Sequence, residues 1–420
     1  MGQTASLDTL KWLVLALAAL TIAGSYYSYD AIAPIAGLLR TQRHFSQSQI
    51  ASLNAVFSLP NIPLSLAGGV IIDRIGAATA SFAAAALSFI GCGLTAIGDP
   101  YALMVTGRLI FGVGTETLYI ALLVGLSQWF ARGGSALAIA LFFSMARVGS
   151  YGADTSTIWA SALYKAGWQP PLWLATGLTG VGLIAATGYW LIDRRAGQHV
   201  AAAPRAEQFR WIDLHGFSTS FWDILWLNVL FASVFFPFRS TFSIQFFQDA
   251  KGLTLDQAGM TNSWVFFAAI IATPICGLIA DRFGRRATLL LIAAALLPVT
   301  FLVLGATHVS LWISTAMMGV SFSVIPAVIW PSTALLVEKN LVGTAFGLIN
   351  MLQSLGLTVS NSVAGALNDR FDASAAHPAG YAPMLLFFGA VGSVAFVAAL
   401  RLWITEFGAG HHGLEDPRNG

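Results

Sequence analysis

The sequence is poor in charged residues. Only 10% of its 420 residues are Asp, Glu, Lys or Arg, whereas 56% are hydrophobic. A soluble domain carries about 25% charged residues because its surface faces water, so this composition excludes an ordinary soluble fold. A lipid bilayer, in contrast, solvates apolar side chains directly. The composition therefore indicates a polytopic membrane protein.

Several kinds of chemical site are also missing from the sequence. The two cysteines, Cys92 and Cys276, lie in separate apolar segments without metal-binding spacing, so we interpret them as packing residues. The seven histidines do not cluster with acids. There is no phosphate-binding P-loop and no nucleophile accompanied by a buried His and an acid. We therefore expect no cofactor, no metal, no nucleic-acid partner and no enzymatic activity.

Long apolar runs dominate what is present. A bilayer core of ~30 Å requires about 20 residues of helix. Twelve runs meet this length, at residues 12–36, 48–72, 78–97, 101–128, 136–163, 170–192, 221–248, 257–281, 286–306, 309–336, 341–366 and 381–404. The longest polar break falls in the middle of the chain. The sequence thus predicts an all-α fold of twelve transmembrane helices in two six-helix halves, 1–192 and 221–408, with a linker at 193–220 and a tail at 409–420.

An internal repeat supports two halves. The pattern G-x-x-x-D-R-x-G occurs at residues 69–76 and again at 277–284, an offset close to half the length of the chain. Both copies end a predicted even-numbered helix, the second and the eighth. At a helix end, an Asp and an Arg can pair with a neighbouring helix and with exposed backbone groups. Parallel halves of this kind are a known transporter plan.

The Lys and Arg residues predict the orientation of the chain, because cytoplasmic loops carry an excess of both. With the N-terminus inside, ten basic residues fall in inner loops and five in outer loops. The inner ones are Arg74, Arg132, Arg194, Arg195, Arg205, Arg210, Arg282, Arg285, Arg286 and Lys339, and the outer ones are Arg40, Arg43, Lys165, Lys251 and Arg370. We therefore expect both termini to be cytoplasmic.

Ionisable residues at mid-depth are the strongest functional signal, since a charge within a span is costly unless it is paired or used. Glu116 precedes the loop residue Arg132 by nearly as many positions as Arg147 follows it. At a rise of about 1.5 Å per residue, both are roughly 22–24 Å from the loop between two antiparallel helices. An acid and a base at one depth suit a zwitterion, with Arg147 for a carboxylate and Glu116 for an ammonium. A purely structural Glu–Arg pair is the equally weighted alternative.

The repeat suggests a second pair. Asp30 and Arg239 lie equally far into the first and seventh predicted helices, if those helices begin at Trp12 and Phe221. Aromatic clusters precede both residues, so the pair could close the outer side with an aromatic plug. Tyr26 and Tyr29 are candidates for substrate contact, although aromatic stripes more often serve packing.

Other polar residues in the spans are weaker candidates. Asp154 follows Arg147 by two helical turns and either faces the same cavity or pairs with Arg108. An intramembrane Arg such as Arg108 requires a carbonyl or carboxylate partner. In the second half, Trp330 and Gln353 are candidates to line the path, together with Asn262 and Asn350. Each of these four more often links neighbouring helices.

The motifs resemble those of a known family. Stretches similar to the lysosomal dipeptide transporters of the major facilitator superfamily, and to their prokaryotic relatives, occur at residues 24–30, 114–118, 144–150, 234–238, 341–347 and 353–357. The R-x-x-x-G-x-G pattern at 108–114 and the repeated D-R loop are similar to superfamily motifs as well. The resemblance implies gating roles for Asp73, Arg74, Asp281 and Arg282. It also implies facilitated movement of dipeptides, with Glu116 and Arg147 holding the peptide termini.

The resemblance also bears on location and partners. Eukaryotic members are sorted to lysosomes and work with an accessory subunit. Residues 1–10 contain no acidic dileucine signal, so we expect a plasma membrane or bacterial inner membrane and do not expect the accessory subunit. We also expect a monomer. Two alternatives remain open. One is a proton-coupled transporter of organic anions or drugs, with Asp30 or Glu116 carrying the proton, and the other is a membrane scaffold or sensor without cargo.

Overall fold

The structure is a computed structural model that describes residues 2–131, 134–196, 216–306, 310–338, 341–408 and 412–416. Within these ranges every regular element is a helix. Only helices satisfy all backbone hydrogen bonds within one apolar segment, which is why long apolar runs fold this way in lipid. The chain divides into two compact units.

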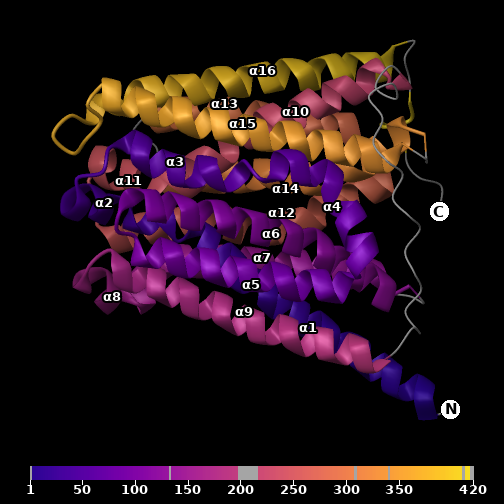
Figure 1. Cartoon of the computed structure of the whole chain (residues 1–420). Coiled ribbons are helices and arrows are strands. Elements are labelled where there is room, and N and C mark those ends of the chain that lie inside the picture. The colour runs from indigo at the N-terminus through magenta and orange to yellow at the C-terminus, as the bar shows by residue number, and fades with distance from the viewer. Residues whose placement is uncertain are drawn as a thin grey trace. The chain divides into compact units, whose positions relative to one another are not determined.

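The first unit comprises Met1–His44 and Val56–Ala206. Its helices are α1 (Gly2–Asp30), α2 (Ile32–Arg43), α4 (Asn61–Ile75), α5 (Ala77–Ile97), α6 (Tyr101–Trp129), α7 (Ser135–Trp159), α8 (Ser161–Ala166) and α9 (Gln169–Ala196). Helix α1 packs against α7 and α9, while α5 packs against α6 and α9 (Figure 1). The helices α1, α6 and α7 carry the ionisable residues singled out above.

The second unit comprises Phe45–Ala55 and Glu207–Gly420. Its helices are the start of α3 (Gln47–Ser58), α10 (Thr219–Pro237), the π-helix η2 (Phe238–Phe242), α11 (Ser243–Lys251), α12 (Leu255–Phe283), α13 (Arg286–Ala306), α14 (Leu311–Leu336), α15 (Val342–Arg370), the 3-10 helix η3 (Pro378–Tyr381) and α16 (Ala382–Phe407). Helix α10 packs against α15 and α16, and α13 packs against α14 and α16.

The helix ends follow local chemistry. Thr254 and Gln257 form a capping box at the start of α12, in which each side chain accepts a hydrogen bond from the other residue's backbone N–H. Gly252 ends α11 in the left-handed conformation that glycine adopts without strain. Pro60 separates α3 from α4, because proline lacks the N–H that a continuous helix needs at that point.

Residues 45–55 belong to the second unit although they come early in the sequence. The Asp369 carboxylate, at the end of α15, accepts hydrogen bonds from the backbone N–H groups of Gln47 (2.7 Å) and Ser48 (2.8 Å). Asp369 thereby caps the first turn of α3, whose N–H groups have no partner within the helix. Farther along, Asn54 Nδ2 donates to the Ser240 carbonyl at 2.9 Å.

The predicted fold class is confirmed as an all-α polytopic membrane protein. Within the described residues, ten helical segments are long and apolar enough to span a bilayer. The two predicted spans outside those ten, 48–72 and 136–163, are also largely helical, as α3 with α4 and as α7. The count of twelve spans and the division at 193–220 stay predictions; residues 197–215 lie outside the described part of the chain.

Candidate functional site

The predicted acid and base lie at matching distances from the ends of two successive helices in the first unit. Glu116 lies nearly as far from the end of α6 at Trp129 as Arg147 lies from the start of α7 at Ser135. A helix rises about 1.5 Å per residue, so both side chains leave their helices about 18–20 Å from these ends. Both side chains are half-buried.

Helix α1 brings a third group near both of them, because it contacts both α6 and α7. The Tyr26 side chain on α1 lies within electrostatic range of Arg147, Glu116 and Asp30. Four residues predicted from the sequence are therefore gathered in one region of one unit. Tyr119 joins them, since it lies within electrostatic range of Tyr26, Arg147 and Glu116. Its position three residues after Glu116, on the same face of α6, is a signal that the sequence predictions missed.

Glu116 and Arg147 do not form a closed pair. Among the residues that the structure describes, the Glu116 carboxylate has no hydrogen-bond donor and no cation within salt-bridge distance. The structural interpretation, in which the two side chains merely lock α6 to α7, requires such a contact. An acid and a base that share a region without touching can instead bind the two ends of a zwitterion.

Arg108 has a different role. Its guanidinium is 2% exposed and donates to the backbone carbonyls of Ser28 (Nη1, 3.2 Å) and Tyr29 (Nη2, 3.4 Å) on α1. The guanidinium carbon also lies 5.3 Å from the centre of the Phe57 ring. Arg108 thus joins α6 to α1 through carbonyl partners, as an intramembrane Arg requires.

Tyr29 and Asp30 are buried beside this arginine. The Tyr29 ring lies 4.7 Å from the Phe57 ring, and Asp30 is 1% exposed and within electrostatic range of Arg108. The ring contact packs the end of α1 against Phe57, and the Asp30 carboxylate shares this buried region with the Arg108 guanidinium. The substrate-binding roles of Tyr29 and Asp30 stay predictions.

Asp154 is fully buried on α7, two helical turns beyond Arg147. That spacing places it about 10 Å farther along the helix axis. Its side chain lies within electrostatic range of Tyr164, and its backbone carbonyl accepts a hydrogen bond from Thr157 at 3.1 Å. A substrate role for Asp154 stays a prediction.

The predicted residues of the second unit are held by their own neighbours. Arg239 is fully buried in the π-helix η2, and its guanidinium carbon lies 4.0 Å from the centre of the Phe266 ring. The widened turn directly follows Pro237, which cannot donate a backbone hydrogen bond. π-Helical turns are frequent at functional sites, and the sequence predictions did not include this one.

Gln353 and Trp330 also contact neighbouring helices. Gln353 on α15 accepts a hydrogen bond from Asn228 Nδ2 on α10 at 2.8 Å. The Trp330 ring on α14 lies edge-on to the Phe346 ring, with 5.1 Å between the ring centres. Both side chains are half-buried. The contacts match the helix-linking alternative, while their roles in a substrate path stay predictions.

The repeated D-R loops share a backbone feature. Gly76 and Gly284, which end the two copies, have positive φ angles of 85° and 70°. A residue with a side chain would be strained there, which explains a glycine at this position of both copies. Arg74 and Arg282 are exposed, and the side chains of Asp73 and Asp281 lie outside the described part of the structure. The gating roles of these four residues stay predictions.

Residues 412–416, in the tail of the chain, lie against the helix start that follows the second D-R loop. Glu415 accepts hydrogen bonds from the backbone N–H of Thr288 (2.7 Å) and from its hydroxyl (3.0 Å). The backbone N–H of Arg286 donates to the Leu414 carbonyl at 2.9 Å. The tail therefore caps the start of α13, where backbone donors lack partners within the helix.

Glu415→Ala is expected to loosen this cap. Loss of a carboxylate at a helix start costs about 1 kcal/mol, so amide exchange at Thr288 should accelerate several-fold in hydrogen–deuterium exchange mass spectrometry. Glu338→Ala, at an exposed Glu near the end of α14, removes the same charge elsewhere and serves as the control. Equal exchange at Thr288 in both variants would show that the cap contributes nothing.

Comparisons with a family profile and with known proteins agree on the class of protein that this chain is similar to. The sequence profile of the Major Facilitator Superfamily matches residues 18–255 and 238–417. The human protein named lysosomal dipeptide transporter MFSD1 (Homo sapiens) is 28% identical over 410 residues, covering 94% of this chain and 86% of its own. The zebrafish protein of the same name (Danio rerio) is 28% identical over 400 residues, covering 91% and 84%.

Among solved structures, the nucleoside transporter NupG is similar with a TM-score of 0.74. It is 12% identical in sequence, and the match covers 94% of this chain and 99% of that one. At this level of identity the likeness concerns the fold alone.

Proposed function

The chain belongs to the major facilitator superfamily, and from this membership we propose that it moves dipeptides or similar small zwitterions across its membrane. As a superfamily member it is a multi-pass membrane transporter of small molecules. The site and the dipeptide transporters among its relatives support the finer proposal. The peptide ammonium is bound by Glu116 and the peptide carboxylate by Arg147.

One observation carries this proposal. The two side chains leave α6 and α7 at matching distances from the helix ends at Trp129 and Ser135, both lie within electrostatic range of Tyr26, and no cation neutralises Glu116 among the described residues. A guanidinium binds a carboxylate through two parallel hydrogen bonds, and a carboxylate accepts several from an ammonium. A molecule that carries both termini satisfies both groups at once, whereas a simple anion leaves Glu116 without a partner.

The mechanism that we propose is alternating access, in which the site faces one side of the membrane and then the other. Transport is uniport-like, driven by the dipeptide gradient. The protein acts as a monomer without an accessory subunit in a plasma membrane or bacterial inner membrane, and both termini are cytoplasmic. Asp73, Arg74, Asp281 and Arg282 act in gating.

A second candidate function is proton-coupled transport of organic anions or drugs. Two carboxyl groups, Asp30 and Glu116, both lie within electrostatic range of Tyr26. Carboxyl groups within spans serve as proton carriers in many transporters. In this case a proton bound to Glu116 would neutralise its carboxylate, as the peptide ammonium does in the first proposal.

Binding and flux measurements separate the two functions. A ligand that binds only the folded state raises the melting temperature. We expect dialanine to stabilise the purified protein, and N-acetyl-dialanine and dialanine amide, each lacking one terminal charge, to have little effect. In proteoliposomes at equal pH, dialanine should exchange across the membrane, and a proton gradient alone should not drive its accumulation. Stabilisation by organic anions but not by dipeptides, with uptake driven by the proton gradient, would favour the second function.

A further inference from the structure

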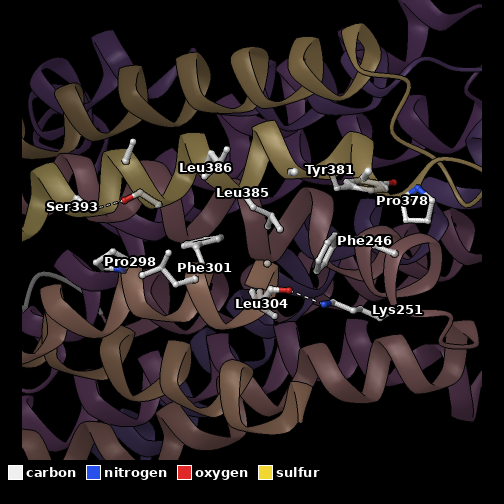
Figure 2. Close-up of a pocket in the computed structure, with 17 residues that line it drawn as sticks. Phe246, Lys251, Pro298, Phe301, Leu304, Pro378, Tyr381, Leu385, Leu386 and Ser393 are labelled. Carbon is white, nitrogen blue, oxygen red and sulfur yellow. Dashed lines mark hydrogen bonds between the residues drawn. The ribbon is translucent and has the colours of Figure 1, made fainter. Parts of the chain in front are cut away.

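A cavity of about 690 Å³ lies in the second unit, between α11, α13, α16 and η3 (Figure 2). It is distinct from the candidate site, whose residues Glu116 and Arg147 belong to the first unit. Apolar side chains form most of its lining, among them Phe246, Pro298, Phe301, Leu304, Leu385 and Leu386. Its size falls within the range of about 300–1,000 Å³ that is typical of small-molecule sites.

The cavity is a groove that faces the membrane. Leu302 and Leu386, which line it, are 62% and 69% exposed on helices that span the bilayer. Its lining on α16 extends from Ala382 to Ser393, a stretch of helix that rises about 17 Å. This length is about half of the ~30 Å hydrocarbon core, which is the depth of one lipid leaflet.

Small residues create the hollow. Gly305 on α13 and Gly389 on α16 both line the groove. A Cβ atom added at Gly389 would lie 3.8 Å from the Phe301 Cβ, which is an ordinary contact. Larger side chains at this position would therefore fill the groove without forcing the backbone apart.

One end of the groove is positively charged. Figure 2 shows Lys251 and Tyr381 at this end, with Pro298 and Ser393 at the other. Lys251, the last residue of α11, donates from Nζ to the Leu304 carbonyl at 2.7 Å. An ammonium has three donors, and no carboxylate lies within salt-bridge distance of Nζ in the described part of the chain.

The nearby acid is already engaged. Asp249 accepts a hydrogen bond from the Tyr381 hydroxyl at 2.6 Å and one from Gln245 Nε2 at 3.4 Å. The ammonium of Lys251 therefore remains the charge that meets a ligand at this end. An apolar groove one leaflet deep with a cation at its end matches a lipid that carries a negative charge.

We propose that this groove binds an anionic phospholipid. An acyl chain lies along the apolar lining between α13 and α16, and the phosphate oxygens accept hydrogen bonds from Lys251. Van der Waals packing of the chain against the lining supplies affinity, because the chain leaves hydrocarbon rather than water, and the ammonium discriminates anionic from zwitterionic headgroups.

Native mass spectrometry of the purified full-length protein tests this assignment. The probes are phosphatidylglycerol, phosphatidylcholine with the same acyl chains, and glycerol 3-phosphate, which has no chain. We expect the wild type to prefer phosphatidylglycerol over phosphatidylcholine by about fivefold, the effect of one basic residue near an anionic lipid. Lys251→Gln should abolish this preference, and Gly389→Leu should reduce the binding of both lipids.

Lys165→Gln removes an equal charge from an exposed helix end in the first unit and should leave the preference unchanged. A melting temperature of Gly389→Leu close to that of the wild type ensures that lost binding reflects a filled groove. The proposal is overturned if Lys251→Gln retains the preference for phosphatidylglycerol. It is also overturned if glycerol 3-phosphate binds as well as the intact lipid, because the site would then recognise a free phosphate.

Discussion

Glu116→Gln and Arg147→Ala are each expected to reduce dialanine flux in proteoliposomes to near the level of protein-free liposomes. Each change removes one charged partner of the zwitterion and leaves the corresponding peptide terminus desolvated without a counter-charge. Losing a hydrogen bond to a charged group costs about 1.5–3 kcal/mol or more, a reduction of roughly tenfold to more than a hundredfold in binding. Initial rates of radiolabelled dialanine uptake measure the effect.

The two variants should also differ in which substrate analogues they still transport at the wild-type rate. N-acetyl-dialanine has no ammonium, so its weak transport should be the same in the wild type and in Glu116→Gln. Dialanine amide has no carboxylate, so its transport should be the same in the wild type and in Arg147→Ala. These comparisons separate a direct contact with the substrate from a general loss of folding.

Glu338→Gln and Arg195→Ala remove one charge each from exposed positions near helix ends and are the matched controls. Both should transport dialanine at the wild-type rate. Flux above half of the wild-type rate in Glu116→Gln or in Arg147→Ala, with the same amount of folded protein, would refute the assigned roles.

Gly149→Val is expected to destabilise the first unit strongly. Gly149 lies on α7, two residues beyond Arg147, and a Cβ atom there would overlap the backbone oxygen of Ala23 on α1. Backbone atoms cannot rotate away as a side chain can, so α1 and α7 would have to separate. Overpacking of this kind costs typically about 1–3 kcal/mol and occasionally more. The variant should therefore melt several degrees below the wild type or fail to fold.

Gly177→Val on α9 is the matched control, because a Cβ atom at Gly177 meets nothing within 4 Å. Both changes place a β-branched residue inside a helix, so the cost in helix propensity is the same. Gly149→Ala, with Gly177→Ala as its own control, gives a milder test in case the valine variant does not fold. Thermal unfolding in detergent measures all four variants. Equal melting temperatures for the two alanine variants would show that α1 and α7 do not depend on this contact.

The distance of each polar residue from the end of its helix could be predicted, because it follows from the number of residues between them. A helix rises by a fixed distance per residue, so the distances of Glu116 and Arg147 from the loop residue Arg132 follow from their positions in the sequence. The helical fold class followed in the same way, since apolar runs in a bilayer can satisfy their backbone only as helices.

The partners of the polar residues could not be predicted in this way. Arg108 was expected to find a carbonyl or a carboxylate, and its hydrogen bonds to the Ser28 and Tyr29 carbonyls depend on how α6 packs on α1. Asp369 was not singled out, because its role as a cap requires residues from the first helices of the chain, Gln47 and Ser48, to lie beside it. Local sequence patterns do not encode such distant contacts.

The sequence alone thus determined that this protein is a helical membrane protein and how far Glu116 and Arg147 lie from the ends of their helices. Both follow from hydropathy and from the constant rise of the helix, whereas the transporter class followed from the resemblance of its motifs to those of the superfamily. The tertiary structure decided the rest: that Tyr26 lies near both Glu116 and Arg147, that Glu415 caps α13, and that α13 and α16 leave a groove ending at Lys251. Rotation of each helix about its axis and the choice of its neighbours decide these features, and both are set by packing between segments that are distant in the chain.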